Sequence, residues 1–218
     1  MSIASNLSNN ITTSGVFKAG AVNNTSVNNV TTFSGITEGG GIYNLLTTNT
    51  ASSSASLNFT SSIDSTYKVY VFKFIKIHPA TDSVRWTFQV STDGGSSYSQ
   101  AMQTNYWNTY SDEGGSSTSL GYRTGEDQNL GTSYQNIGYL VGGDADQCID
   151  GELILYNPSS TTFSKHFVSD TVMGGQGDYV DRAFVSGYVT QTSALNAISF
   201  KFSSGNVESG SIKMYGIS

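Results

Sequence analysis

The segment from Tyr67 to Pro79, YKVYVFKFIKIHP, constrains the fold more than any other part of the sequence. Its apolar residues fall on both sides of an alternating pattern, with Tyr67, Val69, Val71, Ile75 and Ile77 on one side and Tyr70, Phe72 and Phe74 on the other. Successive side chains of a strand point to opposite faces of the sheet, so such a strand is buried on both faces. We therefore predict a long central strand that ends at Pro79, because proline cannot donate within a sheet ladder.

Shorter alternating segments predict further strands. Residues 84–90, VRWTFQV, place Val84, Trp86, Phe88 and Val90 on a buried face and leave Arg85, Thr87 and Gln89 outside. An opening segment, IYNLLT, precedes ASLNFTSSI, and five more strands are predicted in GELILYNPS, TTFSKHFVS, AFVSGYVTQ, AISFKFSSG and SGSIKMYGI. Glycine-, serine- and asparagine-rich turns separate these segments, and none carries the i, i+3, i+4, i+7 stripe of a helix. The pattern predicts an all-β fold, a β-sandwich of jelly-roll type over residues 41–218.

Residues 1–40 differ from this body in composition. They are rich in Asn, Ser and Thr, and GITEGGG closes them with a glycine run that is typical of a hinge. Such a segment buries little apolar surface by itself, so it is either disordered or an extended arm that orders against another subunit. Its isolated apolar residues are spaced like contacts and are the predicted anchors of an attachment arm: Val16, Phe17, Val22, Val27, Val30 and Phe33.

Composition excludes several classes of protein. The net charge is −6 and the few Lys and Arg residues are scattered, so no basic patch predicts nucleic-acid binding. No apolar run approaches the roughly 20 residues that span a bilayer, so no membrane insertion is expected. One cysteine, Cys148, permits no intrachain disulfide framework. The start, MSIASNLSNNITT, lacks the basic and apolar regions of a secretory signal, which predicts synthesis in a cytoplasm.

One short motif resembles the Asp-box of sialidases and other sugar-handling β-proteins. It comprises Ser91, Asp93, Gly95 and Tyr98, with tyrosine where that family has tryptophan. In such a box the Asp carboxylate accepts backbone N–H groups across a turn. We interpret it as a hairpin turn and not as part of a sialidase site, because the arginine cluster of those enzymes is missing.

No catalytic constellation is predicted, and we expect neither an enzyme nor a cofactor. The carboxylate pairs Asp112–Glu113, Glu126–Asp127 and Asp144-x-Asp146 lie in glycine-rich loops where solvation is expected, whereas a glycosidase holds one acid in an apolar pocket. His78 and His166 lie far apart in sequence. No metal site is predicted, although clustered carboxylates leave calcium binding as an open alternative.

The middle of the chain, from about residue 103 to 148, is loop-rich: short strand-like pieces (NYWNTY, SLGYRT and YQNIGYLV) alternate with glycine-rich acidic loops. This region holds the candidate binding residues. Tyr106, Trp107, Tyr110 and Tyr122 combine flat aromatic faces with neighbouring amide and carboxylate groups. Three interpretations stay open for these rings: core residues, a subunit interface, or a glycan-binding surface.

Several segments resemble structural proteins of marine tailed phages, including phages of cyanobacteria. The segments are YVFKFIKIHPATD, GELILYNPSSTTFSKHFVS and SGYVTQTSALNAISFKFSSGNVESGSIKMYGIS, and the resemblance covers most of residues 42–218. It implies a virion component, most specifically a tail fibre or tail-tip protein that takes part in assembly and host adsorption. It brings no active-site residues.

The resemblance also implies partners and a location. The expected partners are other virion proteins, further copies of the chain, with a trimer favoured, and a glycan of the host surface. The expected location is the virion, after synthesis in the host cytoplasm. Two other interpretations remain at this point, a capsid decoration or head-fibre protein and a free carbohydrate-binding module.

Overall fold

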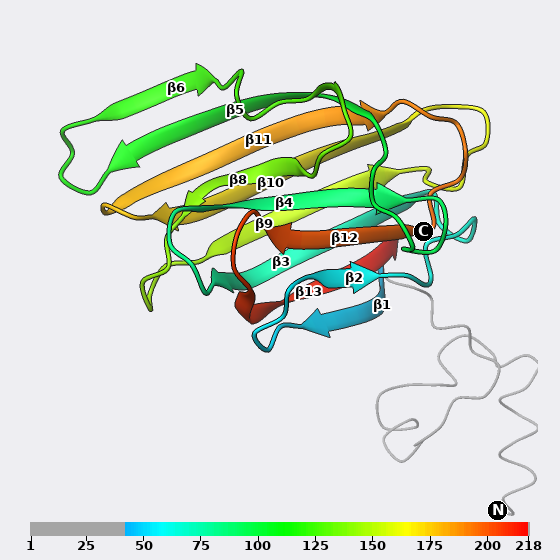
Figure 1. Cartoon of the computed structure of the whole chain (residues 1–218), viewed down its shortest axis with the longest axis horizontal. Coiled ribbons are helices and arrows are strands. Elements are labelled where there is room, and N and C mark those ends of the chain that lie inside the picture. Colours follow the sequence, from blue (N-terminus) through cyan, green and yellow to red (C-terminus); the bar gives the residue numbers. More distant parts are fainter. Residues whose placement is uncertain (1–41, 218) are drawn as a thin grey trace, which may run out of the picture. The chain divides into compact units, whose positions relative to one another are not determined.

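The computed structural model describes residues 42–217, and the predicted anchors of the arm lie outside these residues. The described part contains thirteen strands and no helix (Figure 1). Within it, no helix is long and apolar enough to span a membrane. The strands are β1 (Tyr43–Thr50), β2 (Leu57–Phe59), β3 (Val69–Pro79), β4 (Val84–Ser91), β5 (Met102–Asp112), β6 (Thr118–Tyr122), β7 (Asn129–Gly131), β8 (Gln135–Val141), β9 (Ile149–Tyr156), β10 (Lys165–Gly175), β11 (Tyr179–Val189), β12 (Ala197–Phe202) and β13 (Val207–Ile217).

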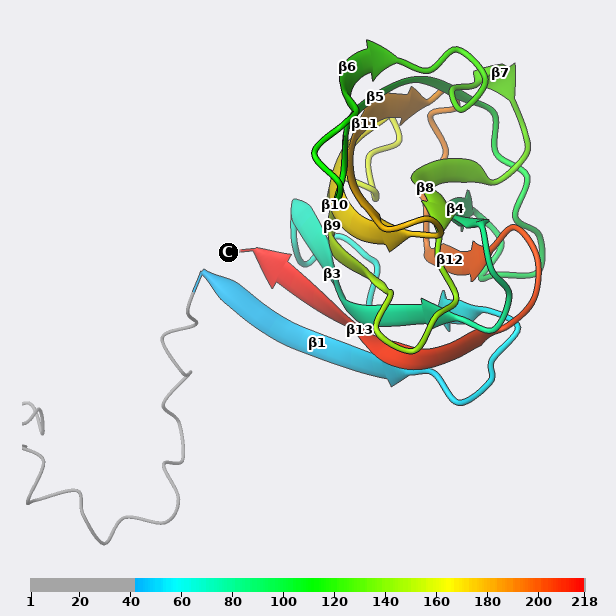
Figure 2. The same ribbon diagram turned by 90° about the vertical axis from the view of Figure 1, so that its left-hand side faces the viewer.

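The strands form two antiparallel layers. The large layer runs in the order β1-β13-β3-β9-β10-β11-β5, and β6 and β7 both pair with β5. The small layer runs in the order β8-β4-β12-β2 and joins the large layer through a single residue pair, Gly175 of β10 with Val141 of β8. Viewed along the strands, the large layer curls around the small one (Figure 2).

The chain crosses between the layers many times. Strands β2, β4, β8 and β12 belong to the small layer, and the segments before and after each of them belong to the large one. The first and last strands, β1 and β13, are neighbours. The predicted all-β sandwich with jelly-roll-type crossings is confirmed.

Aromatic side chains fill the space between the layers. Phe72 and Phe74 of β3 contact Phe200 of β12 with ring centroids 5.4 and 5.2 Å apart. Phe88 of β4 meets Phe167 of β10 at 4.8 Å. Buried rings of this size supply much of the apolar area that stabilises such a fold.

Strand β3 confirms the predicted central position, but its burial on both faces is not confirmed, because Ile75 on the outer face is 37% exposed. The strand also changes phase once. The register with β9 shifts between Phe74 and Ile77, and Lys76 takes a φ of 49°. This irregularity turns Ile77 into the core, where it is fully buried, although strict alternation predicted it on the side of Val69 and Val71.

Strand β4 corrects a second expectation. Thr87 and Gln89 were predicted to lie outside, but both are buried. The Gln89 side-chain amide donates to the carbonyls of Gln100, Thr132 and Ser133, at 3.0–3.1 Å. Loop backbone therefore covers this face of β4. The carbonyl groups of that loop backbone accept hydrogen bonds from the polar Gln89 side chain of the strand.

The Asp-box segment is a turn, but not of a hairpin. Asp93 accepts from the backbone N–H of Ser97 at 2.9 Å and from the hydroxyls of Ser91 and Ser97. The strands on its two sides do not pair with each other: β4 pairs with β8 and β12, whereas β5 pairs with β11, β6 and β7. The hairpin prediction is wrong because the chain crosses from the small layer to the large one at this turn.

Candidate functional site

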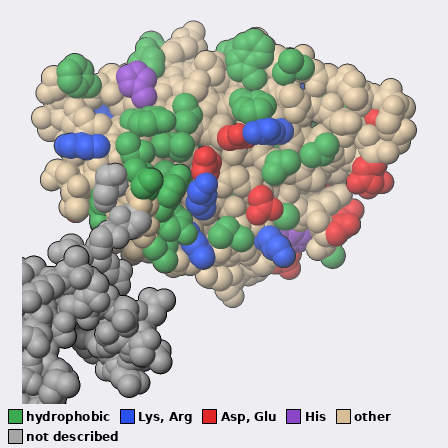
Figure 3. Space-filling model, turned by 180° about the vertical axis from the view of Figure 1, so that it is seen from behind, with side chains coloured by type: hydrophobic (Ala, Val, Ile, Leu, Met, Phe, Trp, Pro, Cys, Tyr) green, Lys and Arg blue, Asp and Glu red, His purple; other side chains and the backbone are tan. Residues whose placement is uncertain are grey.

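The candidate site lies on the outer face of the large layer, the face turned away from the small layer. On β10 and β11 the residues of one phase are buried in the core, and those of the other phase are exposed. The exposed phase is largely apolar and includes Val168, Val172, Phe184 and Tyr188. Figure 3 shows hydrophobic side chains gathered near the middle of this face, beside side chains of both charges.

The strand register aligns one row of side chains across six strands of this face. The pairs are Lys73 with Glu152, Glu152 with Asp170, Asp170 with Phe184, Phe184 with Trp107, and Trp107 with Tyr122. Residues opposite each other in adjacent strands lie within contact distance. The row therefore has a charged half on β3, β9 and β10 and an aromatic half on β11, β5 and β6.

The aromatic half is exposed to solvent. Phe184, Trp107 and Tyr122 have exposed fractions of 37, 47 and 41%. The rings of Trp107 and Tyr122 meet edge to face, with centroids 5.2 Å apart. The guanidinium of Arg182 lies over the Phe184 ring, 4.6 Å from its centroid, in a cation–π contact. Trp107 thus packs against one neighbouring ring and keeps about half of its surface exposed.

The charged half is internally neutralised. Lys73 donates to Glu152, and Arg182 donates through two nitrogens to the two carboxylate oxygens of Asp170, at 2.9 and 2.6 Å. These hydrogen bonds to Asp170 raise the pKa of Arg182. A glycosidase keeps one carboxyl in an apolar pocket without a cation, so Glu152 and Asp170 do not have the surroundings of such a pair.

A groove of about 320 Å³ lies beside this row. Ile154, Val168, Phe184 and Trp107 give it apolar walls, and polar groups of Asn105, Glu152, Asp170 and Ser186 lie along it. Its volume is at the lower end of the range for small-molecule sites.

Two polar atoms along the groove have no partner within residues 42–217. Asn105 accepts from Ser186 through its carbonyl oxygen at 2.9 Å, and its amide nitrogen is unused. Glu152 accepts from Lys73 through one oxygen, and its second oxygen is unused. The groove can therefore offer one donor and one acceptor to a ligand.

The same face becomes acidic at one end. A second hollow of about 450 Å³ is lined by Asp112, Glu113, Asp146 and Asp150 together with Cys148. Burial, with Asp150 nearby, raises the pKa of Cys148 to about 11, which makes its thiolate scarce at neutral pH. No group of three or more His, Cys, Asp or Glu within the described part of the chain could hold a metal ion.

The four predicted binding residues separate in the structure. Trp107 and Tyr122 lie together on the outer face, as described above. Tyr106 is fully buried on the opposite face of β5, and burial raises its pKa. Tyr110 is half-buried and contacts Tyr179 at 4.9 Å. Only residues 105–110 were predicted as a short strand-like piece, but residues 102–112 are one continuous strand, so neighbouring rings point to opposite faces.

The other half of the groove was not predicted. Phe184 and Glu152 lie in segments that were predicted as strands, and Asp170 lies one residue beyond the predicted segment 161–169, in β10. None of the three was proposed as a site residue. A signal was present in the sequence: the strands 165–175 and 179–189 carry apolar residues in both phases, whereas only one phase is needed for the core. Only the register shows that these residues meet Trp107.

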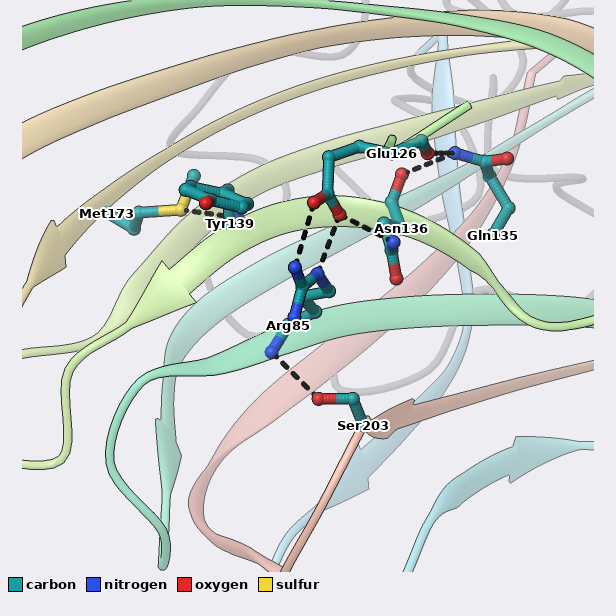
Figure 4. A network of polar contacts seen from close by, with 7 residues as sticks. All are labelled: Arg85, Glu126, Gln135, Asn136, Tyr139, Met173 and Ser203. Atoms are coloured by element: carbon teal, nitrogen blue, oxygen red, sulfur yellow. Dashed lines mark hydrogen bonds and ion pairs between the residues drawn. The ribbon is translucent and has the colours of Figure 1, made fainter. Parts of the chain in front are cut away.

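The carboxylate Glu126 corrects a further expectation. It was predicted to be solvated, but it is buried and forms a bidentate ion pair with Arg85 of β4 at 2.7 and 2.9 Å (Figure 4). Asn136 of β8 donates to the same carboxylate at 2.7 Å, and Gln135 donates to the backbone carbonyl of Glu126. This network fastens the connection between β6 and β7 to the small layer, so its role is structural.

Comparison of the chain with models of known protein families gives no match, and neither the curated proteins nor the solved structures contain a match. The outer face is therefore interpreted from its own chemistry.

Proposed function

We propose that the chain is a non-enzymatic structural protein of a phage virion, a tail fibre or tail-tip component that takes part in assembly and host adsorption. The virion assignment rests on the resemblance of the segments quoted above to proteins of marine tailed phages. An all-β body without a disulfide framework suits a protein that folds in a host cytoplasm and then works outside the cell.

The observation that carries the adsorption role is the exposed aromatic row on the outer face. Phe184, Trp107 and Tyr122 are not needed for the core, which lies on the other face of the same strands. Exposed aromatic groups held on rigid strands are typical of surfaces that bind a partner. In the proposed function this face contacts the host surface, and residues 1–40 attach the chain to neighbouring protomers or to other virion proteins.

The proposal is tested on purified particles of the phage that carries this chain. Antibodies raised against residues 41–218 are used for immunogold electron microscopy, and the particle proteins are identified by mass spectrometry. We expect label at the tail end, and we expect an excess of the purified chain to slow adsorption of the particles to host cells.

Two other outcomes would overturn either the tail assignment or the virion assignment. Label on the head would replace the tail assignment with a capsid decoration or head-fibre protein. Absence of the chain from the particles would overturn the virion assignment and favour a free carbohydrate-binding module.

A further inference from the structure

We propose that the groove beside Trp107 binds an uncharged oligosaccharide, whose pyranose rings stack on the aromatic row and whose hydroxyls meet the polar groups along the groove. The inference rests on the proposed adsorption role, which it deepens by naming the ligand class of the same face.

The aromatic row fits the apolar face of a sugar ring. The face of an aromatic ring is electron-rich, and the axial C–H groups of a pyranose carry a small positive charge. Phe184 and Trp107 are paired on the adjacent strands β11 and β5 and both line the groove, so they form its aromatic platform, and Tyr122 of β6 packs against Trp107 edge to face. A rigid platform costs a ligand little ordering of the protein on binding.

The polar groups beside the platform match sugar hydroxyls. A hydroxyl both donates and accepts, and the groove offers the unused amide nitrogen of Asn105 and the unused oxygen of Glu152. These two groups come from β5 and β9, and Phe184 of β11 also lines the groove. A ligand with hydroxyls on both sides of an apolar face can form hydrogen bonds with Asn105 and Glu152 and can pack its apolar face on Phe184.

The charges of the face favour a neutral sugar over an acidic one. Lys73 with Glu152 and Arg182 with Asp170 cancel each other, so the described residues that line the groove offer no unpaired cation to a carboxylate or a sulfate. Lys213 of β13, which has no ion pair among the described residues, lies opposite Lys73 in the sheet and does not line the groove. Asp112, Glu113, Asp146 and Asp150 gather at one end of the same face and repel anionic polysaccharides.

The same pattern disfavours a flat protein partner. Two ion pairs interrupt the apolar surface beside the platform, and a protein that covered them would have to desolvate four charges. A second copy of the chain would bring an equal acidic end to the interface. A protein partner is therefore an outcome of the test and not the proposal.

The test is a titration of the full-length chain with neutral gluco-, galacto- and mannooligosaccharides, followed by intrinsic fluorescence. The chain has two tryptophans, and Trp86 is fully buried, so a change in emission reports on Trp107. We expect at least one neutral oligosaccharide to shift the emission in a saturable manner, and we expect alginate and sialyllactose to leave it unchanged.

Variants identify the site, with saturation-transfer NMR on the sugar as the readout. Trp107→Ala should weaken binding by about tenfold or more, since one buried aromatic contact is worth that much, and Trp107→Phe should restore part of it. Phe163→Ala is the matched control, because Phe163 is 70% exposed and does not line the groove. Unchanged binding in Trp107→Ala, preference for the acidic sugars, or no binding of any sugar overturns the inference.

The outcome is separable from that of the proposed function. If the chain is found at the tail end and competes for adsorption but binds no sugar, the inference fails and the adsorption role stands. If a neutral sugar binds at Trp107 but the chain is absent from particles, the virion assignment fails and the sugar site stands. Concentration-dependent self-association that Trp107→Ala abolishes would assign the face to a second copy instead.

Discussion

At the scale of the residue, Gly151 of β9 illustrates how a close backbone approach fixes one amino acid. Its φ is 141°, and a Cβ added there would lie 2.3 Å from the carbonyl oxygen of Asp170 on the neighbouring strand. We expect Gly151→Ala to lower the free energy of unfolding by about 2 kcal/mol or more, measured by urea denaturation.

Gly121→Ala is the control for this substitution. Gly121 also lies in a strand, but a Cβ there meets no atom within 4 Å. We expect a change within about 0.5 kcal/mol. Equal effects of the two substitutions would contradict the steric explanation.

Asp181 of β11 is a second residue with a measurable consequence. It is buried, one carboxylate oxygen accepts from Asn108 at 2.7 Å, and the other has no partner within the described residues. Burial raises the pKa of Asp181, and the hydrogen bond from Asn108 and the charge of Arg123 oppose the rise only in part. Folding therefore shifts the equilibrium of this carboxyl toward the protonated form relative to the unfolded chain.

The sign of the pH dependence follows from this direction. A raised pKa in the folded state contributes stability below the unfolded value of 3.8, and this contribution is lost as the pH rises through the folded value. We expect Asp181→Asn to raise Tm at pH 7 by about 2 °C or more, with a gain that disappears near pH 3. Asp178→Asn, at an exposed position, should show no such gain. A lower Tm for Asp181→Asn at pH 7 would show that the charge is needed.

At the scale of the element, the turn after β4 shows what a local motif can and cannot determine. Hydrogen bonds from Ser91 and Ser97 lower the pKa of Asp93, so the ionised carboxylate stabilises the turn. This contribution is present above the unfolded value of 3.8 and is lost as the pH falls through the lower folded value.

We therefore expect Asp93→Ala to lower Tm at pH 7, and we expect the difference from the unmodified chain to shrink as the pH falls below 4 in a thermal melt followed by circular dichroism. Asp146→Ala provides the comparison, because Asp146 is exposed and its carboxylate has no hydrogen-bond partner in residues 42–217. A pH-independent difference for Asp93→Ala would indicate that packing, and not the carboxylate, stabilises the turn.

The strands themselves were largely predictable, and their surroundings were not. Alternation in the sequence predicts β3, β4 and β9–β13, because period 2 is a local property of an extended chain. Alternation failed for Gln89, because a distant loop covers this residue of β4, and for Thr87, which is buried and donates its hydroxyl to the Lys201 carbonyl of β12. Alternation also predicted β5 only over residues 105–110 and missed its full length, because polar residues interleave the aromatic ones on a face that is exposed to solvent.

At the scale of the whole molecule, the described residues contain a core enclosed between two layers. Residues 1–40 were predicted to attach the chain to other subunits. We expect a chain of residues 41–218 to keep the β-type circular dichroism spectrum and a cooperative thermal transition. We also expect it to lose the trimer that we expect of the full chain, as measured by light scattering after size exclusion.

The control for this truncation is a full-length chain in which Val22, Val27 and Val30 are replaced by Ser, which preserves length and removes apolar contacts. It should behave like the truncated chain. An unchanged oligomer in both variants would remove the arm from the assembly mechanism, and loss of the cooperative transition would show that the body depends on residues 1–40.

The sequence by itself determined the class of the fold, because alternation of side chains along a strand is a local rule that neighbouring residues obey without reference to the rest of the chain. It also determined that Trp107 and Tyr122 were candidate binding residues. Only the tertiary structure decided that Lys73, Glu152, Asp170, Phe184, Trp107 and Tyr122 form one row, because neighbours across a sheet are set by pairing and register between segments far apart in sequence. The same register decided which aromatic side chains face solvent and which, like Tyr106, fill the core.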